Sequence, residues 1–261
     1  MSSNSAVVIP LYREDLSALE LRLVKNNLAV LSSHAIIFLL PDGLNTNWLE
    51  ANLAISRYKT VWVSQEWLGE KNGIAGYNRM MLSASFYRLF EEWEYILICQ
   101  SDVYIFRDEL SHWCNQGYDC IAAPWVKRPI YSLPILKQYM TLRRAILSRP
   151  MSHIKQDLYG KIGNGGLSLR RVSSFIAACE RYRTKIEYFL AREGHLYHED
   201  VFWALVPEDF SYPSQEEAMH FSIDTNPKYC MKKLRGKLPF GCHGLTRSRL
   251  HKFWSKIVPE I

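Results

Sequence analysis

Runs of apolar residues alternate with amphipathic stretches along the first hundred positions of the chain. Four runs are continuously apolar or β-branched: 6–10, 35–40, 60–63 and 95–100. Three stretches between them are expected to be helices: 14–31, 46–57 and 77–92. Continuously apolar strands that alternate with helices are typical of sheets covered on both faces. The pattern therefore predicts an α/β fold with a mostly parallel central sheet.

The second half of the chain is less regular. Residues 127–155 contain Pro129, Pro134 and Pro150, and an amphipathic helix is expected near 135–147. We interpret this stretch as a basic insertion. The other expected elements are a glycine-rich strand entry at 163–171, helices at 172–190 and 197–205, and a loop at 237–245.

The composition is that of a folded chain with a large core. Of 261 residues, 48% are hydrophobic and 13% aromatic, which excludes wholesale disorder. The six cysteines form no C-x-x-C pair, and no apolar stretch approaches the ~18 residues of a membrane-spanning helix. The start "MSSNSAVVIPLY" lacks the pattern of a signal peptide. These features predict a cytoplasmic protein with reduced thiols.

Positive charge is concentrated in two segments. The net charge is +6, and residues 127–155 hold seven Lys or Arg while residues 228–256 hold nine, with no Asp or Glu in either. Such segments favour anionic partners, namely phosphates, an anionic membrane surface or nucleic acid. Nucleic acid is disfavoured because no stacking-rich motif of a known module accompanies the charge. The alternative interpretation is two solvated faces without a specific partner.

A single acid, Asp102, follows the apolar run "YILICQ" at 95–100. Ligands of parallel sheets bind beyond the carboxyl ends of the strands, so this carboxylate is expected to face a cleft and not the core. In a cleft it could hold a divalent cation that bridges the phosphates of a nucleotide. Alternatively, Asp102 caps the next turn or pairs with an arginine.

Three further motifs are candidates for chemistry. "HED" at 198–200 supplies Glu199 and Asp200; a carboxylate in a cleft can act as a general base, although acids also favour a helix start. "GNGG" at 163–166 permits close approach of a ligand or forms a turn, and it matches neither a dinucleotide fingerprint nor a P-loop. His243 in "FGCHGL" is a metal-ligand candidate or an ordinary loop residue.

The order of these motifs resembles the GT-A class of nucleotide-sugar glycosyltransferases. More closely, the chain is similar to a bacterial family of GT-A-like proteins, known partly as glycosyltransferases and partly as a domain of unknown function. The stretches that carry the resemblance are "VVIPLYR", "YNRMML", "YILICQSDVYIF", "GYDCIAAPW", "GNGGLSLR", "HEDVFW" and "LPFGCHGL". They span positions 7–245, nearly the whole chain.

The resemblance implies a GT-A (nucleotide-diphospho-sugar transferase) fold, Rossmann-like, as a single domain over 1–261. Within it, we expect a nucleotide-binding half at 1–126 and a basic helical insertion at 127–160. The acceptor and catalytic half, with the C-terminal tail, is expected at 161–261.

Roles for individual residues are also implied by the resemblance. Asp102 matches one acid of the Asp-x-Asp motif and His243 the late histidine that hold a divalent metal, Mn²⁺ or Mg²⁺; the second acid is absent. Asp200 matches the base that deprotonates the acceptor hydroxyl in inverting members, and Glu199 beside it would bind acceptor or donor sugar. The residues implied to bind the nucleotide and donor are Pro10, Tyr12, Asp42, Asn78, Arg79, Gln100, Ser101, Asp102, Gly165 and Gly166.

These features together predict a hexosyltransferase-like enzyme. It would move a sugar, most simply from a UDP-sugar, to a hydroxyl of a glycan or glycolipid in bacterial surface polysaccharide synthesis. Without a metal, Lys and Arg of the basic tail would stabilise the leaving diphosphate. Retention of configuration stays open beside inversion. The basic segment 127–155 is expected to contact the inner face of an anionic membrane.

Two rival functions use the same features. A non-catalytic nucleotide-sugar-binding or glycan-binding protein on the same scaffold would explain the missing second acid. A nucleotidyltransferase is disfavoured, because that class needs a glycine-rich loop after the first strand and "IPLYRED" has no glycine.

Overall fold

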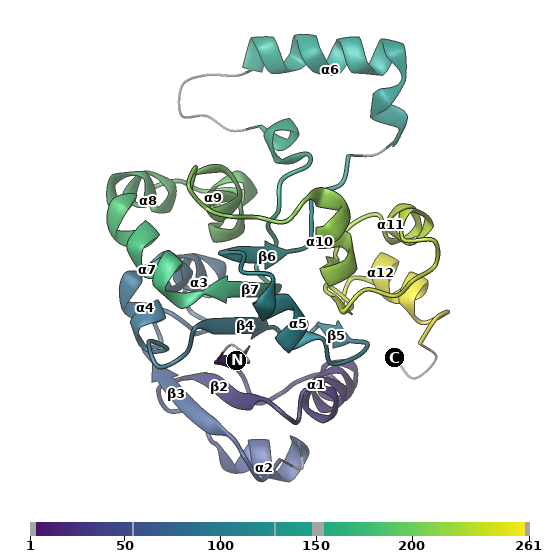
Figure 1. Cartoon of the computed structure of the whole chain (residues 1–261). Helices are drawn as coiled ribbons and strands as arrows, with labels where there is room; N and C mark the ends of the chain where they lie inside the picture. Colours follow the sequence, from purple (N-terminus) through teal and green to yellow (C-terminus); the bar gives the residue numbers. More distant parts are fainter. Residues whose placement is uncertain (1–3, 54, 128, 148–153, 259–261) are drawn as a thin grey trace.

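The computed structural model describes residues 4–53, 55–127, 129–147 and 154–258 (Figure 1). The strands are β1 (Ser5–Pro10), β2 (Ala35–Pro41), β3 (Lys59–Val63), β4 (Tyr95–Cys99), β5 (Tyr104–Ile105), β6 (Cys120–Ala122), β7 (Leu167–Arg171), β8 (Ser222–Ile223) and β9 (Gly241–Cys242). The α-helices of the first half are α1 (Ala18–Val30), α2 (Asn47–Leu53), α3 (Gly73–Met81), α4 (Ala84–Arg88) and α5 (Leu110–Asn115). Those of the second half are α6 (Pro134–Leu147), α7 (Val172–Arg181), α8 (Arg183–Leu190), α9 (Glu199–Leu205), α10 (Gln215–Phe221), α11 (Pro227–Lys233) and α12 (Ser248–Trp254). Short 3-10 helices are η1 (Pro129–Ser132), η2 (Lys155–Leu158) and η3 (His195–Tyr197).

A six-stranded sheet with the order β3-β2-β1-β4-β7-β6 forms the core, and helices pack on both of its faces. Successive side chains of a strand point to opposite faces. In β1, Val8 therefore packs in a cluster with residues of α3, α4, α7 and α9, whereas Val7 and Ile9 pack with α1, α2 and α5. All residues of β1 and β4 are buried. This two-sided burial explains the continuously apolar strands, and the α/β prediction is confirmed.

The strand order creates a switch point between β1 and β4. β1 pairs in parallel with β2 on one side and with β4 on the other, and β2 pairs in parallel with β3. In open sheets of this kind, ligands bind beyond the carboxyl ends of the strands at the point where the strand order reverses. The predicted mostly parallel sheet is confirmed for these four strands, while β7 runs antiparallel to both β4 and β6.

A second sheet, of the order β5-β9-β8, brings three distant segments together. β9 is antiparallel to β5 and parallel to β8, with Cys242 paired to both Tyr104 and Ile223. Consequently, the residues after Ile223 and Cys242 emerge at the same end of this sheet as the residues before Tyr104. The stretch 237–245, predicted to be a loop, contributes a strand here. A two-residue strand leaves no periodic signal in a sequence.

Two predicted helices are each divided into two. The stretch predicted at 77–92 forms α3 and α4, with Ser83 in an extended conformation between them. The stretch predicted at 172–190 forms α7 and α8, which meet at Tyr182, whose hydroxyl donates a hydrogen bond to Asp209. Apolar periodicity continues across both breaks, so the sequence indicates the buried face but not the change of direction.

The helix expected near 135–147 is present as α6, and Figure 1 shows it extending along the top of the molecule. Two contacts join α6 to η2: the Arg144 guanidinium lies 3.1 Å from the Asp157 carboxylate, and Gln156 Nε2 donates to the Met140 carbonyl at 3.2 Å. No helix in the described part of the chain is long and apolar enough to cross a membrane.

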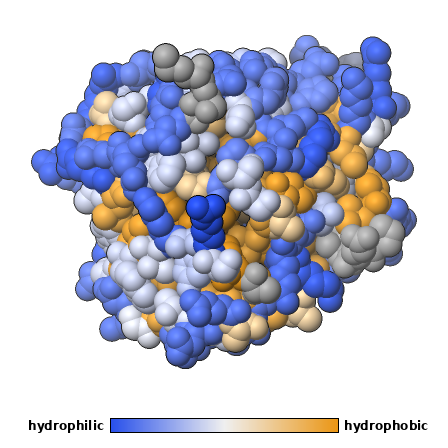
Figure 2. Space-filling model, turned by 60° about the horizontal axis from the view of Figure 1, so that its bottom comes forward, coloured by the Kyte–Doolittle hydropathy of each residue, from blue (hydrophilic) through white to orange (hydrophobic). Residues whose placement is uncertain are grey.

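On the face shown in Figure 2, hydrophilic side chains surround apolar side chains, which are visible mainly in a band across its middle. All six cysteines are free and buried. They therefore contribute to the packing of the core as small apolar groups and form no cross-links.

Candidate active site

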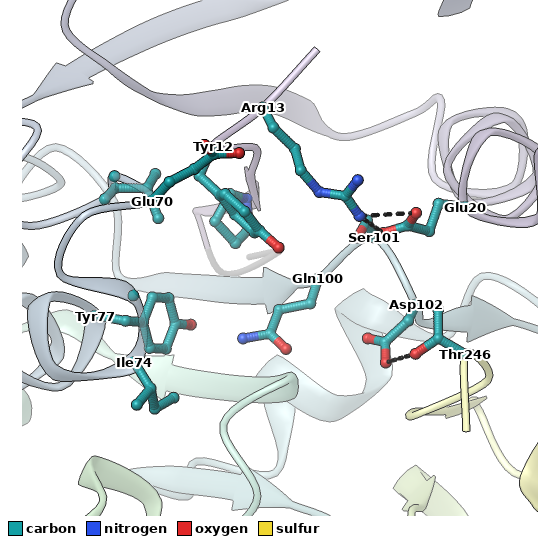
Figure 3. Close-up of a pocket in the computed structure, with 14 residues that line it drawn as sticks. Tyr12, Arg13, Glu20, Glu70, Ile74, Tyr77, Gln100, Ser101, Asp102 and Thr246 are labelled. Atoms are coloured by element: carbon teal, nitrogen blue, oxygen red, sulfur yellow. Dashed lines mark hydrogen bonds and ion pairs between the residues drawn. The ribbon is translucent and has the colours of Figure 1, made fainter. Parts of the chain in front are cut away.

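A pocket of about 710 Å³ opens at the switch point between β1 and β4 (Figure 3). We call it the sheet-edge pocket. Pro10 ends β1, and Gln100, Ser101 and Asp102 directly follow β4, so the carboxyl ends of both strands supply its wall. The other residues labelled in Figure 3 are Tyr12, Arg13, Glu20, Glu70, Ile74, Tyr77 and Thr246. The side chain of Gln100 extends into the space between Tyr77 and Asp102.

Glu20 fixes one wall of the sheet-edge pocket. It completes a capping box at the start of α1, because Ser17 Oγ accepts from its backbone N–H and its own carboxylate accepts from the Ser17 N–H. The same carboxylate accepts from Arg13 at 2.9 Å and from Ser101 Oγ at 3.0 Å. Burial alone would raise the pKa of Glu20, but the hydrogen bonds from Ser17 and the charge of Arg13 lower it below its ordinary value. Glu20 therefore stays ionised and ties the loops after β1 and β4 together.

Asp102, His243 and Asp224 form a hydrogen-bonded chain at the end of the three-stranded sheet. His243 Nε2 lies 3.2 Å from Asp102 Oδ1, and His243 Nδ1 lies 3.0 Å from Asp224 Oδ1. Thr246 Oγ1 donates to the other Asp102 oxygen at 3.1 Å, and Arg247 pairs with Asp224. The register of β5, β8 and β9 explains the arrangement, since Asp102 precedes β5 while Asp224 and His243 directly follow β8 and β9.

The charges in this chain stabilise one another. Burial would lower the pKa of His243, but its hydrogen bonds to Asp102 and Asp224 raise it to about 9. Burial would raise the pKa of both aspartates, but the hydrogen bonds and charge of His243, together with Arg247, hold each below its ordinary value. At neutral pH the imidazole is therefore protonated and donates from both nitrogens.

Asp102 and His243 are the two side chains that could hold a divalent cation here. Their facing atoms are 3.2 Å apart and share the Nε2 proton, so a cation would have to displace this proton to bind both side chains. Within the described residues, however, no three His, Cys, Asp or Glu side chains form a metal-binding group. A cation held here would need further oxygen ligands from water or from a bound diphosphate.

The two acids of "HED" differ in environment. Glu199 is buried and forms an ion pair with Arg170, with oxygen to Nη2 distances of 3.1 and 3.2 Å. Its backbone N–H donates to Asn78 Oδ1 at 3.0 Å, which satisfies the first turn of α9. Asp200 has no cationic partner within 4.0 Å among the described residues. Burial, then the charges of Glu199 and Asp224, raise the pKa of Asp200 to about 7.

The glycines of "GNGG" allow side chains to approach closely. A Cβ at Gly165 would lie 2.0 Å from a carboxylate oxygen of Glu199, and a Cβ at Gly166 would lie 2.1 Å from His243 Nε2. A residue with a side chain would therefore clash with Glu199 at position 165 and with His243 at position 166. The two glycines thus seat Glu199 and His243, and neither lines the sheet-edge pocket.

A second pocket, of about 910 Å³, is lined by Asp224, Arg247 and Trp125. We call it the basic pocket. The chain of contacts from Asp102 through His243 and Asp224 to Arg247 begins in the sheet-edge pocket and ends in this one. Asp200 is close by, because a Cβ at Gly163 would touch both the ring of Trp125 and the carbonyl oxygen of Asp200.

The remaining predicted nucleotide-binding residues lie outside the sheet-edge pocket. Asp42 follows β2 on the surface and donates its backbone N–H to the Val63 carbonyl at 2.9 Å. Asn78 is buried against Glu199, and Arg79 is exposed on α3. The structure therefore brings Pro10, Tyr12, Gln100, Ser101 and Asp102 together but places these three elsewhere.

Sequence reasoning missed two important residues. Asp224 follows the short, partly apolar stretch "FSI", as Asp102 follows a longer apolar strand. Glu20 is the last residue of "SALE", a capping-box pattern of Ser-x-x-Glu. Both signals were present, but neither indicates which distant residue the carboxylate meets.

Comparison with known protein families identifies the chain. Residues 57–243 match the family described as "Protein of unknown function (DUF5672)". The chain belongs to this family. The matched region includes Asp102, Asp200 and Asp224 and ends at His243, whereas β1 and its loop precede it. No curated protein matches the chain by sequence.

Solved structures resemble this DUF5672 protein in fold. Mouse xyloside xylosyltransferase 1, in its apo form, is 11% identical with a TM-score of 0.54, over 92% of this chain and 97% of that one. The galactosyltransferase LgtC in complex with donor and acceptor sugar analogs is 11% identical with a TM-score of 0.55, over 91% and 86%. GlyE of Streptococcus pneumoniae TIGR4, a glycosyltransferase, is 12% identical with a TM-score of 0.51, over 97% and 60%. At such identities the likeness establishes the fold, which is GT-A as predicted.

Proposed function

We propose that this protein is a glycosyltransferase that moves a sugar from a nucleotide-diphosphate donor to a hydroxyl of a glycan or glycolipid. The observation that supports this best is the sheet-edge pocket of a GT-A fold, which Asp102 lines and where His243 lies 3.2 Å behind the Asp102 carboxylate. LgtC, which has this fold, was solved with donor and acceptor sugar analogs. In our proposal the donor occupies the sheet-edge pocket, and Tyr12, 45% exposed there, offers a ring face for stacking of the base.

Asp200 is the proposed general base. A carboxylate with a pKa near 7 suits this role, because it is available as a base at neutral pH and still basic enough to accept a proton. The acceptor oxygen attacks the anomeric carbon while its proton passes to Asp200. The bond from that carbon to the diphosphate breaks, and the diphosphate leaves with the electron pair. Direct displacement of this kind inverts the configuration of the sugar.

The leaving diphosphate requires positive charge nearby. We propose that Asp102 and His243 hold a divalent cation, Mn²⁺ or Mg²⁺, that would neutralise this charge when bound. In a metal-independent enzyme, the protonated His243, which contacts Asp102 at 3.2 Å, would supply the charge. A metal titration distinguishes these two versions of the site.

We also propose that α6 contacts the cytoplasmic leaflet of an anionic membrane. Four apolar residues at helical spacing are between 58% and 81% exposed: Ile135, Tyr139, Leu142 and Ile146. Lys137, Arg143 and Arg144 lie on the same helix, which gives the basic, amphipathic character of interfacial helices. The membrane contact would be ruled out if the protein did not sediment with vesicles of acidic phospholipid at low salt and the Ile135→Ser and Leu142→Ser variants gave the same result.

Thermal unfolding with UDP, GDP, CMP or dTDP, each with and without Mn²⁺, tests the donor site. A ligand at 100 times its Kd adds about 2.7 kcal/mol, enough to raise the melting temperature by a few degrees. We expect the largest shift with UDP and Mn²⁺. Asp102→Asn should remove the shift, and Asp42→Asn should keep it, because Asp42 lies outside the sheet-edge pocket.

Each outcome has a distinct meaning. A rise in melting temperature that needs Mn²⁺ supports a cation bound by Asp102 and His243. A rise without metal supports cationic side chains as the groups that bind the diphosphate. No shift with any nucleotide would overturn the donor site and leave a non-catalytic glycan-binding protein as the better interpretation. Release of UDP from a UDP-sugar in the presence of a glycan acceptor would exclude that alternative.

A further inference from the structure

Both basic segments of the sequence meet in the basic pocket. Arg143 and Lys155 come from the insertion around α6 and η2, and Lys228 and Lys232 come from α11. Arg247 and Arg249 from the start of α12 complete the group of six. Asp224 is the one acid among the lining residues that the structure describes. Two runs that are separated by about seventy residues in sequence thus form a single cationic surface.

Most of these cations lack a compensating charge. Arg247 pairs with Asp224, but the other five have no carboxylate within 4.0 Å in the described ranges of the chain. Elsewhere on the insertion, Arg144 does pair with Asp157 at 3.1 Å. Like charges that converge in a cleft repel one another and raise the local concentration of anions. A bound anion would relieve this repulsion.

Aromatic side chains form the other part of the wall. Trp125, Tyr131, Tyr159, Tyr229 and Phe253 line the same pocket. The rings of Tyr131 and Tyr159 are stacked, with centroids 6.2 Å apart and an interplanar angle of 29°. Ligand pockets typically combine such apolar walls with a few charged groups that fix orientation. The ligand that fits has an anionic group and, attached to it, an apolar or ring-shaped body.

The basic pocket is also placed beside the reacting groups. Asp224 lines it and is joined through His243 to Asp102 in the sheet-edge pocket. Trp125 lines it and is in close contact with Gly163, next to the carbonyl of Asp200. The basic pocket is therefore next to the backbone of Asp200 and is connected to the sheet-edge pocket through hydrogen-bonded side chains, as expected of an acceptor site beside a donor site.

We propose that the basic pocket binds the acceptor, and that this acceptor carries a phosphate or diphosphate group. The cations of the insertion and of the segment 228–249 bind the phosphate oxygens by charge-assisted hydrogen bonds, and the aromatic wall contacts the attached body. The word acceptor rests on the proposed transferase function. The binding of a phosphate ester in this pocket does not.

Isothermal titration with three probes tests the proposal: pyrophosphate, glucose 1-phosphate and farnesyl diphosphate. The test variant is Arg143→Gln with Lys232→Gln, which removes one cation from each basic segment. The matched control is Lys137→Gln with Lys233→Gln, which removes the same charge from the same two helices outside the basic pocket. We expect at least one phosphate ester to bind at least tenfold more weakly to the test variant, and less than a twofold change in the control.

The thermal shift with UDP separates this proposal from the donor site. Both variants should keep the shift, because their substituted residues lie outside the sheet-edge pocket. If farnesyl diphosphate binds more tightly than glucose 1-phosphate, a lipid-linked acceptor is supported. If glucose 1-phosphate binds more tightly, a phosphorylated sugar is supported. Equal affinities in test and control variants would overturn the proposal. So would displacement of the phosphate esters by UDP, or preferential binding of a single-stranded oligonucleotide at this surface.

Discussion

Two neighbouring clusters of charged side chains differ in whether a ligand can contact them. Arg170 and Glu199 form a closed pair whose side chains are only 2% and 4% exposed. Tyr87 accepts from the same guanidinium at 2.7 Å and Ser168 at 3.0 Å, so the pair is satisfied from within the protein. The chain from Asp102 to Arg247 is open instead, because its first and last members line pockets.

This difference separates structural from chemical roles for the same residue types. In the closed pair the buried Glu199 carboxylate is satisfied by Arg170, so the pair holds α9 against β7. In the open chain a ligand can meet a charged group at either end. Asp200 follows Glu199 in sequence, but its raised pKa reflects the charges of both Glu199 and Asp224. It is therefore the residue at which the two clusters meet.

The largest effect is expected from Asp200→Asn. Transfer should fall by about 10²–10⁴-fold, the usual contribution of a general base, while the thermal shift with nucleotide is retained. Asp209→Asn is the matched control, because Asp209 is an exposed aspartate that pairs with Arg181. Full transfer by Asp200→Asn would remove Asp200 from the base role.

Arg170→Met should be the most destabilising change in the closed pair. It leaves the Glu199 carboxylate buried without its cation, a loss typically of about 3–5 kcal/mol in the free energy of unfolding. Urea denaturation measures it, and Lys59→Met is the control. Lys59 pairs with Glu92 at 3.0 Å with both side chains more than half exposed, and such pairs contribute about 0–1 kcal/mol.

A double variant sharpens the same test. Arg170→Met with Glu199→Leu removes the orphaned charge and should recover part of the lost stability. If the double variant were less stable than Arg170→Met alone, the unpaired carboxylate would not be the cause of the loss.

Transfer should depend on pH through Asp200. Because a base must be ionised, we expect kcat/KM to fall about tenfold per pH unit below 7 and to level off above it. Stability should move in the opposite direction. The folded state keeps the Asp200 proton up to about pH 7 while the unfolded chain loses it near 3.8, so unfolding becomes easier as the pH rises through this window. Asp200→Asn should abolish this contribution to both profiles.

The smallest effect concerns the hydrogen-bonded series of side chains from Asp102 to Arg247. Asp224→Asn removes one of the two carboxylates that raise the pKa of His243 to about 9, so that pKa should fall toward 6.5. NMR titration of the His243 ring measures it, with Asp209→Asn as the control. In the native protein, the stability that His243 contributes is complete below pH 6.5 and is lost as the pH rises through 9. An unchanged pKa in Asp224→Asn would show that Asp224 does not stabilise the imidazolium.

The parallel half of the fold could be predicted from sequence because its signals are local. Each strand from β1 to β4 contains an apolar or β-branched run that the sequence shows directly. Asp102 follows the last of these runs, and the rule for ligands in parallel sheets explains why it lines a pocket. The helix breaks at Ser83 and Tyr182 could not be predicted, since both sides of each break share one buried face.

The partners of the site residues could not be predicted for a different reason. Asp224 and His243 are brought to Asp102 by strands of two residues each, too short for any periodicity. Glu199 was expected to touch substrate, yet nothing in "HED" indicates that Arg170 would meet it.

The three-stranded sheet has a consequence for biosynthesis. Its middle strand, β9, is made after β5 and β8, and it delivers His243 between the two aspartates. A nascent chain can therefore assemble β1 to β4 and their helices while His243 is still inside the ribosome. A chain that stops before β9 would keep Asp102 and Asp224 but lack the imidazolium that joins them.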